Sequence, residues 1–265
     1  MNQLYLMDTC FVDGRFKGYP FPVQCAMTAD LGIEAILPIA NCVSPHDLAQ
    51  APHDHGISLA AVYHTAHLND TADDLQRALD HIPAGVDIEL SVNGDVSFDD
   101  GLGSACTLLD AALAYAEDRD CRICLYPHIK YYTDRIEKTV ALCQRYQSDR
   151  LQTVFCGFHW YNEDGTELPQ RITAAMPYLA GVNVCGSREG GKVAGYTIEA
   201  LDGGELDNAA LLGLLAHHGF TGRIGIQGYG IGGDPYAHLT RSVPWLRSTL
   251  ERVRAHPEWF AHLSA

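Results

Sequence analysis

The sequence predicts a single-domain α/β protein whose fold is a (β/α)8 barrel, the TIM barrel. Three observations carry this prediction: apolar segments alternate with amphipathic ones, eight such units fit within the 265 residues, and no stretch has the composition of an interdomain linker. Strands that are apolar on both faces and alternate with helices indicate a parallel sheet, and eight units in about 250 residues are what a closed barrel needs. An open doubly wound sheet is less favoured, because no G-x-G-x-x-G motif follows the first strand.

The eight expected strands are short apolar runs, each followed by a helical pattern. The strands are residues 3–8, 33–40, 57–64, 86–93, 121–128, 151–160, 180–186 and 222–230. The helical patterns are residues 21–32, a short polar segment at 46–56, 71–82, 104–118, 133–148, 170–179, 208–219 and 237–256. Because a barrel of this kind places its chemistry at the carboxyl ends of the strands, the residues at those ends are the candidates for a site.

The composition excludes several classes of partner. The chain has 33 acidic and 18 basic residues and a formal net charge of -15, which repels phosphate backbones and anionic membrane surfaces. No apolar run of about 18 residues is present, and the first residues lack the pattern of a signal peptide. The nine cysteines lack the spacing of a disulfide framework. We expect a cytoplasmic protein that binds neither nucleic acid nor membrane.

Polar side chains stand at most of the expected strand ends. A single histidine on a strand is more often a packing residue than a base or a ligand, so it is the convergence of several polar residues on one rim that favours a site. The candidates are His64, Glu89, Tyr126, His128, Lys130, His159, Asn183, Arg188, Lys192, Gln227 and Tyr229.

Glycine-rich segments follow the seventh and eighth strands, at residues 185–195 and 227–235. Glycine lets backbone N–H groups approach a ligand closely, and barrels commonly hold a phosphate at these two loops. With Arg188 and Lys192 nearby, we expect an anionic or multiply hydroxylated ligand there. The alternative is that these glycines only form tight turns.

Five segments carry a resemblance to a known family. They are ADLGIEAI (29–36), ISLAAVYH (57–64), ICLYPHIKYYTDRIEKTVALC (123–143), CGFHWYNEDG (156–165) and IGIQGYGIGGDPYAHLTRSVPWLR (224–247). The sequence resembles the sugar phosphate isomerase/epimerase family, the xylose isomerase-like barrels, over nearly its whole length. The resemblance implies a TIM barrel that acts on carbohydrates.

The resemblance also implies a divalent metal held by a Glu, an Asp, a His and a Glu after strands five to eight. The corresponding positions here are Tyr126, Cys156, Asn183 and Gln227. Oxygen-rich metal sites need anionic carboxylates, and this set offers little charge at neutral pH. We therefore expect the usual cation to bind poorly. The alternative is a rebuilt site for zinc or manganese, with His128 and His159 as the first candidate ligands and Cys156 or Glu89 as a further one.

In the family, the two metal-binding glutamates also carry protons between adjacent sugar carbons, so other residues must do that work here. His128 and His159 titrate near neutral pH and are expected to act as general base and acid. Lys130 is expected to polarise a carbonyl. The remaining candidates, Tyr126, Asn183, Arg188, Lys192, Gln227, Tyr229, His64 and Glu89, are expected to bind the substrate.

The predicted function is that of a carbohydrate isomerase or epimerase that abstracts a proton next to a sugar carbonyl. One alternative is a 3-keto-glycoside lyase or hydratase, whose reaction begins with the same step. Another is a non-catalytic sugar-binding or partner subunit that kept the barrel and lost the metal. The sequence is compatible with a homo-oligomer, and the amphipathic segment 251–263 is expected to cover the barrel or a neighbouring subunit.

Overall fold

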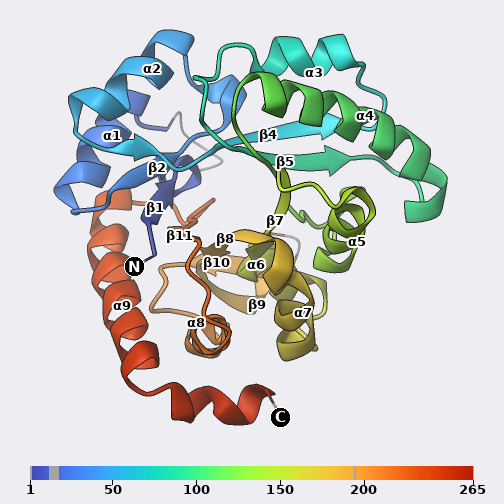
Figure 1. Ribbon diagram of the computed structural model, residues 1–265. Coiled ribbons are helices and arrows are strands. Elements are labelled where there is room, and N and C mark those ends of the chain that lie inside the picture. Colours follow the sequence, from blue (N-terminus) through green and yellow to red (C-terminus); the bar gives the residue numbers. More distant parts are fainter. Residues whose placement is uncertain (1, 12–17, 194, 265) are drawn as a thin grey trace.

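A ring of parallel strands forms the centre of the structure, a computed structural model that describes residues 2–11, 18–193 and 195–264 (Figure 1). The strands of the ring are β1 (Leu4–Met7), β2 (Ala35–Leu37), β3 (Ser58–Leu59), β4 (Val62–His67), β5 (Ile88–Asn93), β6 (Ile123–Leu125), β7 (Leu151–Cys156), β8 (Leu179–Val184) and β11 (Arg223–Ile226). They pair in the order β3-β2-β1-β11-β8-β7-β6-β5-β4.

The ring closes because one barrel strand is split into two halves. In that strand, β3 pairs with β2, and β4 pairs with β5 after a short break in the chain. A parallel bridge between Ile39 and Tyr63 joins the two sides, and the N–H of Tyr63 donates to the carbonyl of Pro38 at 2.8 Å. The nine strands therefore fill eight positions, and the predicted (β/α)8 barrel is confirmed.

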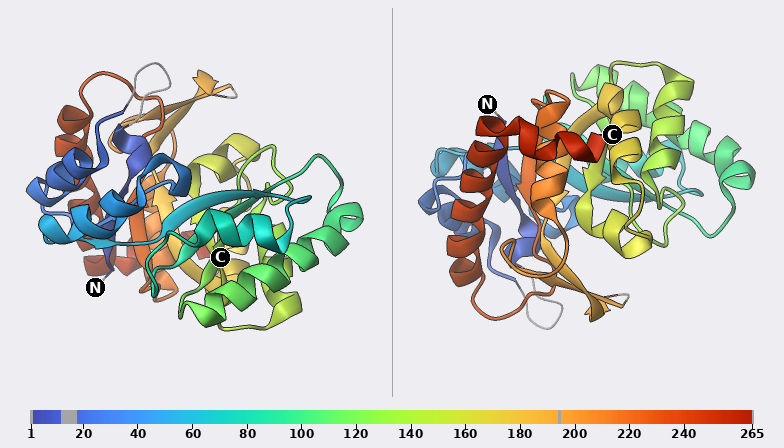
Figure 2. Two further views of the ribbon diagram at one scale, coloured as in Figure 1. Left: turned by 90° about the horizontal axis from the view of Figure 1, so that it is seen from above. Right: turned by 90° about the horizontal axis from the view of Figure 1, so that it is seen from below.

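Helices cover the outside of the ring (Figures 1 and 2). They are α1 (Phe21–Asp30), α2 (Pro45–Asp54), α3 (Ala72–Leu79), α4 (Phe98–Asp118), α5 (Ile136–Tyr146), α7 (Leu168–Ala175), α8 (Asn208–His217) and α9 (Pro235–Ala255). Polar side chains mark several helix starts; Thr71 and Asp74 form a reciprocal capping box at α3. Within the described residues, no helix is both long and apolar enough to cross a bilayer.

Buried apolar side chains form two layers. The larger one packs the outward face of the strands against the helices, and the smaller one fills the interior of the barrel. Alternation along each strand decides which layer a residue joins. The interior layer includes Tyr5, Cys124, Tyr126, Cys156 and Cys185.

The sixth expected strand ends earlier than predicted. Strand β7 stops at Cys156, and the short helix α6 (Gly157–Glu163) begins at the next residue. The prediction of a strand through residue 160 was wrong, because a short, mostly apolar run such as residues 151–160 suits a buried strand and a buried helix equally well. The turn at residue 157 brings His159 back over the barrel end.

The segment after β8 is a hairpin rather than an open loop. Strand β9 (Gly186–Val193) pairs antiparallel with β10 (Tyr196–Glu199), and the hairpin projects beyond the barrel in Figure 2. A Cβ on Gly191 would lie 2.1 Å from the backbone of Tyr196, so this pairing needs glycine.

The C-terminal segment η4 (Pro257–Ser264) packs on the barrel's own helix α8. Gly213 of α8 lies against the ring of Phe260, and a Cβ at residue 213 would come within 2.3 Å of that ring.

Candidate active site

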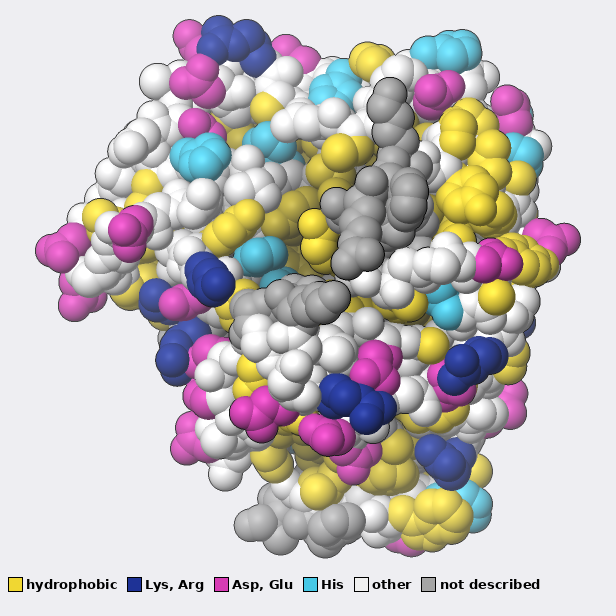
Figure 3. Space-filling view, turned by 180° about the vertical axis from the view of Figure 1, so that it is seen from behind, with side chains coloured by type: hydrophobic (Ala, Val, Ile, Leu, Met, Phe, Trp, Pro, Cys, Tyr) yellow, Lys and Arg dark blue, Asp and Glu magenta, His cyan; other side chains and the backbone are white. Residues whose placement is uncertain are grey.

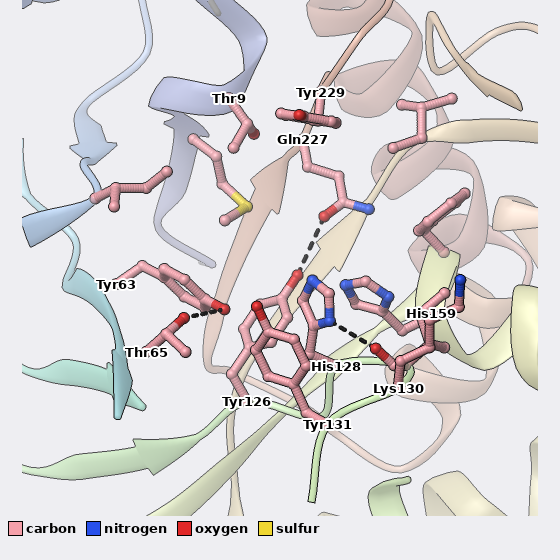
Figure 4. A pocket seen from close by; sticks show the side chains of 15 residues that line it. Thr9, Tyr63, Thr65, Tyr126, His128, Lys130, Tyr131, His159, Gln227 and Tyr229 are labelled. Atoms are coloured by element: carbon pink, nitrogen blue, oxygen red, sulfur yellow. Dashed lines mark hydrogen bonds between the residues drawn. The ribbon is translucent and has the colours of Figure 1, made fainter. Parts of the chain in front are cut away.

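A cavity of about 590 Å³ opens at the carboxyl ends of the strands (Figure 4). Its lining is mostly aromatic and aliphatic, with a few polar groups, which is typical of a small-molecule site. The lining residues are Met7, Thr9, Ile39, Tyr63, Thr65, Tyr126, His128, Ile129, Lys130, Tyr131, Phe158, His159, Ile198, Gln227 and Tyr229. In the space-filling view, hydrophobic and histidine side chains gather in the central hollow, whereas acidic side chains are spread over the surrounding surface (Figure 3).

Six of the candidates from the sequence meet in this cavity: Tyr126, His128, Lys130, His159, Gln227 and Tyr229. They come from the ends of β6, β7 and β11, which are separated in sequence but lie on one side of the barrel.

The contacts of His128 fix its tautomer. Its Nδ1 lies 2.9 Å from the carbonyl oxygen of Ile129, and since a carbonyl only accepts, Nδ1 carries the proton. In the neutral ring the lone pair therefore belongs to Nε2, and Figure 4 shows the ring directed into the cavity. The ring is held between Tyr131 and His159, whose ring centroids are 4.1 and 4.2 Å away.

His159 lies on α6 and is nearly buried. Its Nδ1 has no hydrogen-bond partner among the described residues. Burial, and secondarily the neighbouring His128, holds the pKa of His159 well below its usual value of 6.5. Burial also lowers the pKa of His128, so both rings are neutral at pH 7 and form an uncharged imidazole pair.

Lys130 supplies the cationic side chain of the described lining, which contains no carboxylate. The backbone of Lys130 is left-handed, with φ at 67°, in a turn where the N–H of Tyr131 donates to the carbonyl of His128. Non-glycine residues adopt this conformation only where the surroundings impose it, and such residues cluster at functional sites.

The floor of the cavity is a cluster of uncharged groups that bond to one another. The hydroxyl of Tyr126 lies 3.2 Å from Sγ of Cys156 and 3.2 Å from Oε1 of Gln227. The amide nitrogen of Gln227 donates to Sγ of Cys185 at 3.5 Å. Burial raises the pKa of Cys156 to about 11 and that of Tyr126 well above 10, so the thiol and the phenol keep their protons at pH 7.

These residues do not fit the divalent metal that the family resemblance implies. Three of the four ligand positions, Tyr126, Cys156 and Gln227, are neutral and engaged with one another. Among the described residues, no group of three or more His, Cys, Asp or Glu side chains is placed to hold a metal ion. The rebuilt site on His128 and His159 therefore lacks a third ligand.

The remaining ligand position, the one expected after the seventh strand, needs a correction. Asn183 was aligned with the family's histidine, but the side chain beside Gln227 is that of Cys185. Both residues face the barrel interior, and Asn183 lies two residues deeper, where its Oδ1 accepts from the hydroxyl of Tyr5 at 2.5 Å. The sequence could not decide between two positions on the same face of one strand.

Glu89 also lies beneath the cavity and does not line it. Its side chain is fully buried and pairs with Arg223, Nη2 to Oε1 at 3.2 Å, while Asn183 donates to its other oxygen at 3.4 Å. Arg223 in turn contacts Asp87 at 2.9 Å. Glu89 and Asn183 are thus parts of a buried ion-pair network under the site.

Two further candidates lie outside the described cavity lining, and a third has a side chain that the structure does not describe. Tyr63 and Thr65 of β4 face the cavity, so strand alternation directs the intervening His64 toward the helix layer. Arg188 pairs within the hairpin with Glu199, Nε to Oε1 at 2.6 Å, so its guanidinium is already engaged by a carboxylate. Lys192 is a residue of β9, and its side chain lies outside the described part of the chain.

The sequence-based set missed several lining residues, among them Tyr63, Tyr131 and Phe158. The signal for Tyr131 was its position in YPHIKYY, after three chosen candidates and directly beside Lys130. The signal for Tyr63 was the alternation that excludes its neighbour His64.

The fold and the position of this cavity define a TIM-barrel protein with a candidate site at the usual end of the barrel. The chain belongs to the xylose isomerase-like TIM barrel family, whose model matches residues 29–249. A search of curated protein sequences gave no match.

Several solved structures share the fold at low sequence identity. The 3-keto-D-glucoside 4-epimerase of E. coli has a TM-score of 0.68 at 14% identity, covering 94% of this chain and 100% of that one. The D-allulose 3-epimerase of a Methylomonas species has a TM-score of 0.70 at 12% identity, covering 94% and 97%. The probable 3-DHS dehydratase of Bacillus anthracis has a TM-score of 0.67 at 12% identity, covering 93% and 99%.

Proposed function

We propose that this protein is a carbohydrate-active enzyme that begins its reaction by removing a proton from the carbon next to a sugar carbonyl. The observation that carries the proposal is the neutral His128, whose Nδ1 is tied to Ile129 and whose Nε2 lone pair faces the cavity. A general base of this kind contributes about 10²- to 10⁴-fold to a rate.

The other polar groups of the cavity suit the second requirement, stabilisation of the enediolate that forms. The Lys130 ammonium supplies positive charge at the wall that holds His128. The hydroxyl of Tyr126 and the amide of Gln227 can exchange their mutual hydrogen bond for bonds to sugar oxygens. No step of this scheme requires a metal ion.

Isomerisation and epimerisation share this first step, and the similar structures include two sugar epimerases. A 3-keto-glycoside lyase or hydratase is the second candidate. It is favoured by the cavity of about 590 Å³, which has room for a glycoside as well as for a single sugar ring. A non-catalytic sugar-binding subunit is less well supported, because the tautomer of His128 and the neutral state of both paired imidazoles suit proton transfer.

The test is the replacement His128→Gln, which keeps a polar side chain of similar length and removes the base. We expect it to lower turnover of ketoses or 3-keto-glycosides by at least about tenfold, and by as much as about 10²-fold or more if His128 is the sole base. His67→Gln is the matched control, since His67 is exposed at the end of β4 and outside the cavity lining. Equal turnover by wild type and His128→Gln would refute the assignment.

A further inference from the structure

The nitrogen bases of the cavity lie on one wall. His128 and His159 follow the neighbouring strands β6 and β7, and their ring centroids are 4.2 Å apart. Lys130 lies two residues beyond His128. Figure 4 shows the two imidazoles side by side, with Tyr63 and Thr65 on the far side of the cavity. A ligand in the cavity therefore meets the two imidazoles and the Lys130 side chain from the same side.

The opposite wall carries groups that do not exchange protons with carbon at neutral pH. It comes from the ends of β1, β2 and β4 and consists of Met7, Thr9, Ile39, Tyr63 and Thr65. The hydroxyl of Tyr63 donates to Ser91 at 2.9 Å and accepts from Thr65 at 3.1 Å, and burial raises the pKa of Tyr63 to about 12. The phenol therefore keeps its proton.

The remaining tyrosines of the lining do not supply a second base. The Tyr126 hydroxyl is bonded to Gln227 and Cys156 at the floor, and Tyr131 stacks on His128 itself. Tyr229 is 46% exposed, at the rim of the cavity.

Asp8 is the carboxyl group beside the opposite wall. It follows β1, its Oδ2 accepts from the N–H of Ile39 at 2.7 Å, and burial raises the pKa of Asp8 to about 7. Its neighbours Met7 and Thr9 line the cavity, whereas Asp8 does not. Among the described residues, Asp8 is the candidate for a second base on that wall, which makes it the group to test.

We propose that the proton leaves and returns on the same face of the bound sugar, so that the enzyme isomerises or eliminates rather than inverts a carbon centre. Inversion requires a proton carrier on each face, and the described lining offers carriers on one face only. This inference rests on the proposed function and specifies its stereochemical course.

The electron flow is balanced without a further reagent. Nε2 of His128 takes the proton, the C–H electron pair forms a carbon–carbon double bond, and the carbonyl oxygen becomes an enediolate beside Lys130. In isomerisation, the neighbouring hydroxyl gives its proton to that oxygen, and the imidazolium protonates the former carbonyl carbon. In elimination, the carbonyl re-forms, the bond to the β-oxygen breaks, and the imidazolium protonates the departing oxygen.

The test follows the carbon next to the carbonyl by NMR in D2O. The probes are methyl 3-keto-β-D-glucoside, in which the C2 proton and the C1 oxygen share one face, and D-fructose and D-allulose. We expect deuterium at the exchanged carbon with retained configuration, in at least tenfold excess over the epimer, together with elimination or isomerisation. His128→Gln should abolish the exchange, and Asp8→Asn should leave it unchanged.

Two other results have distinct meanings. Accumulation of the C2 or C3 epimer at a rate comparable with exchange would overturn the inference, and loss of that epimer in Asp8→Asn would identify the second base. Exchange with none of the probes would instead count against the proposed function for these sugar classes, so the two failures can be told apart.

Discussion

Three contacts prepare His128 for proton abstraction. The Ile129 carbonyl fixes the proton on Nδ1, Tyr131 and His159 hold the ring from both sides, and burial keeps the ring neutral. In the family that the sequence resembles, metal-binding carboxylates are expected to carry the proton. Here an uncharged imidazole takes that place, and its charge state sets the pH range of activity.

We predict that kcat/KM falls on the acid side. Since burial lowers the pKa of His128 below 6.5, the free enzyme holds the neutral base throughout the neutral range and loses it only as pH falls below that value. The folded-state His128 also binds fewer protons than the same residue in the unfolded chain in this range, so its contribution to stability decreases with falling pH, and unfolding midpoints must be measured alongside. Activity that is level or rising down to about pH 4 would contradict the role of His128.

The sequence predicted single residues correctly where a motif fixed their position. It misplaced residues that were chosen only because they lie at the end of an expected strand. His128 and His159 belong to YPH and CGFH, and both line the cavity. His64 and Tyr63 are adjacent at a strand end, and their relative orientation depends on a register that the sequence does not contain. The sequence likewise does not show that Cys185, rather than Asn183, lies at the level of Gln227 in the barrel.

At the level of elements, the junction of β7 and α6 creates the site. Because the strand ends at Cys156, the thiol faces the barrel interior and the helix returns His159 to the side of His128. A continued strand would have put Cys156 and His159 on opposite faces. The segment after β8, expected as an open glycine-rich loop, forms the hairpin of β9 and β10, which pairs Arg188 with Glu199.

The strands beneath the site contain a buried ion network, and we predict that it stabilises the barrel strongly. Arg223→Ala leaves Glu89, which is fully buried, without its cation, and should lower the free energy of unfolding by about 3–5 kcal/mol. Urea denaturation measures the effect. Arg188→Ala is the matched control, because its ion pair is exposed and should matter far less. Equal losses in both variants would contradict the structural role of Arg223.

At the scale of the whole molecule, the fold was predictable because eight strand–helix repeats leave few other ways to bury eight apolar strands. The hydrogen-bonded cluster on the cavity floor was not, because its members come from β6, β7, β8 and β11, up to 101 residues apart. Substituted ligand positions indicated a changed site. Only the structure shows that the replacing side chains form hydrogen bonds with one another.

The most direct test of this account is deuterium uptake from D2O at the carbon next to the carbonyl of methyl 3-keto-β-D-glucoside, measured by NMR before and after exhaustive chelation. Metal content is followed by plasma mass spectrometry. A site that works through neutral His128 predicts the same uptake rate in the chelated protein, with metal well below one equivalent. Loss of uptake on chelation, restored by zinc or manganese, would contradict it.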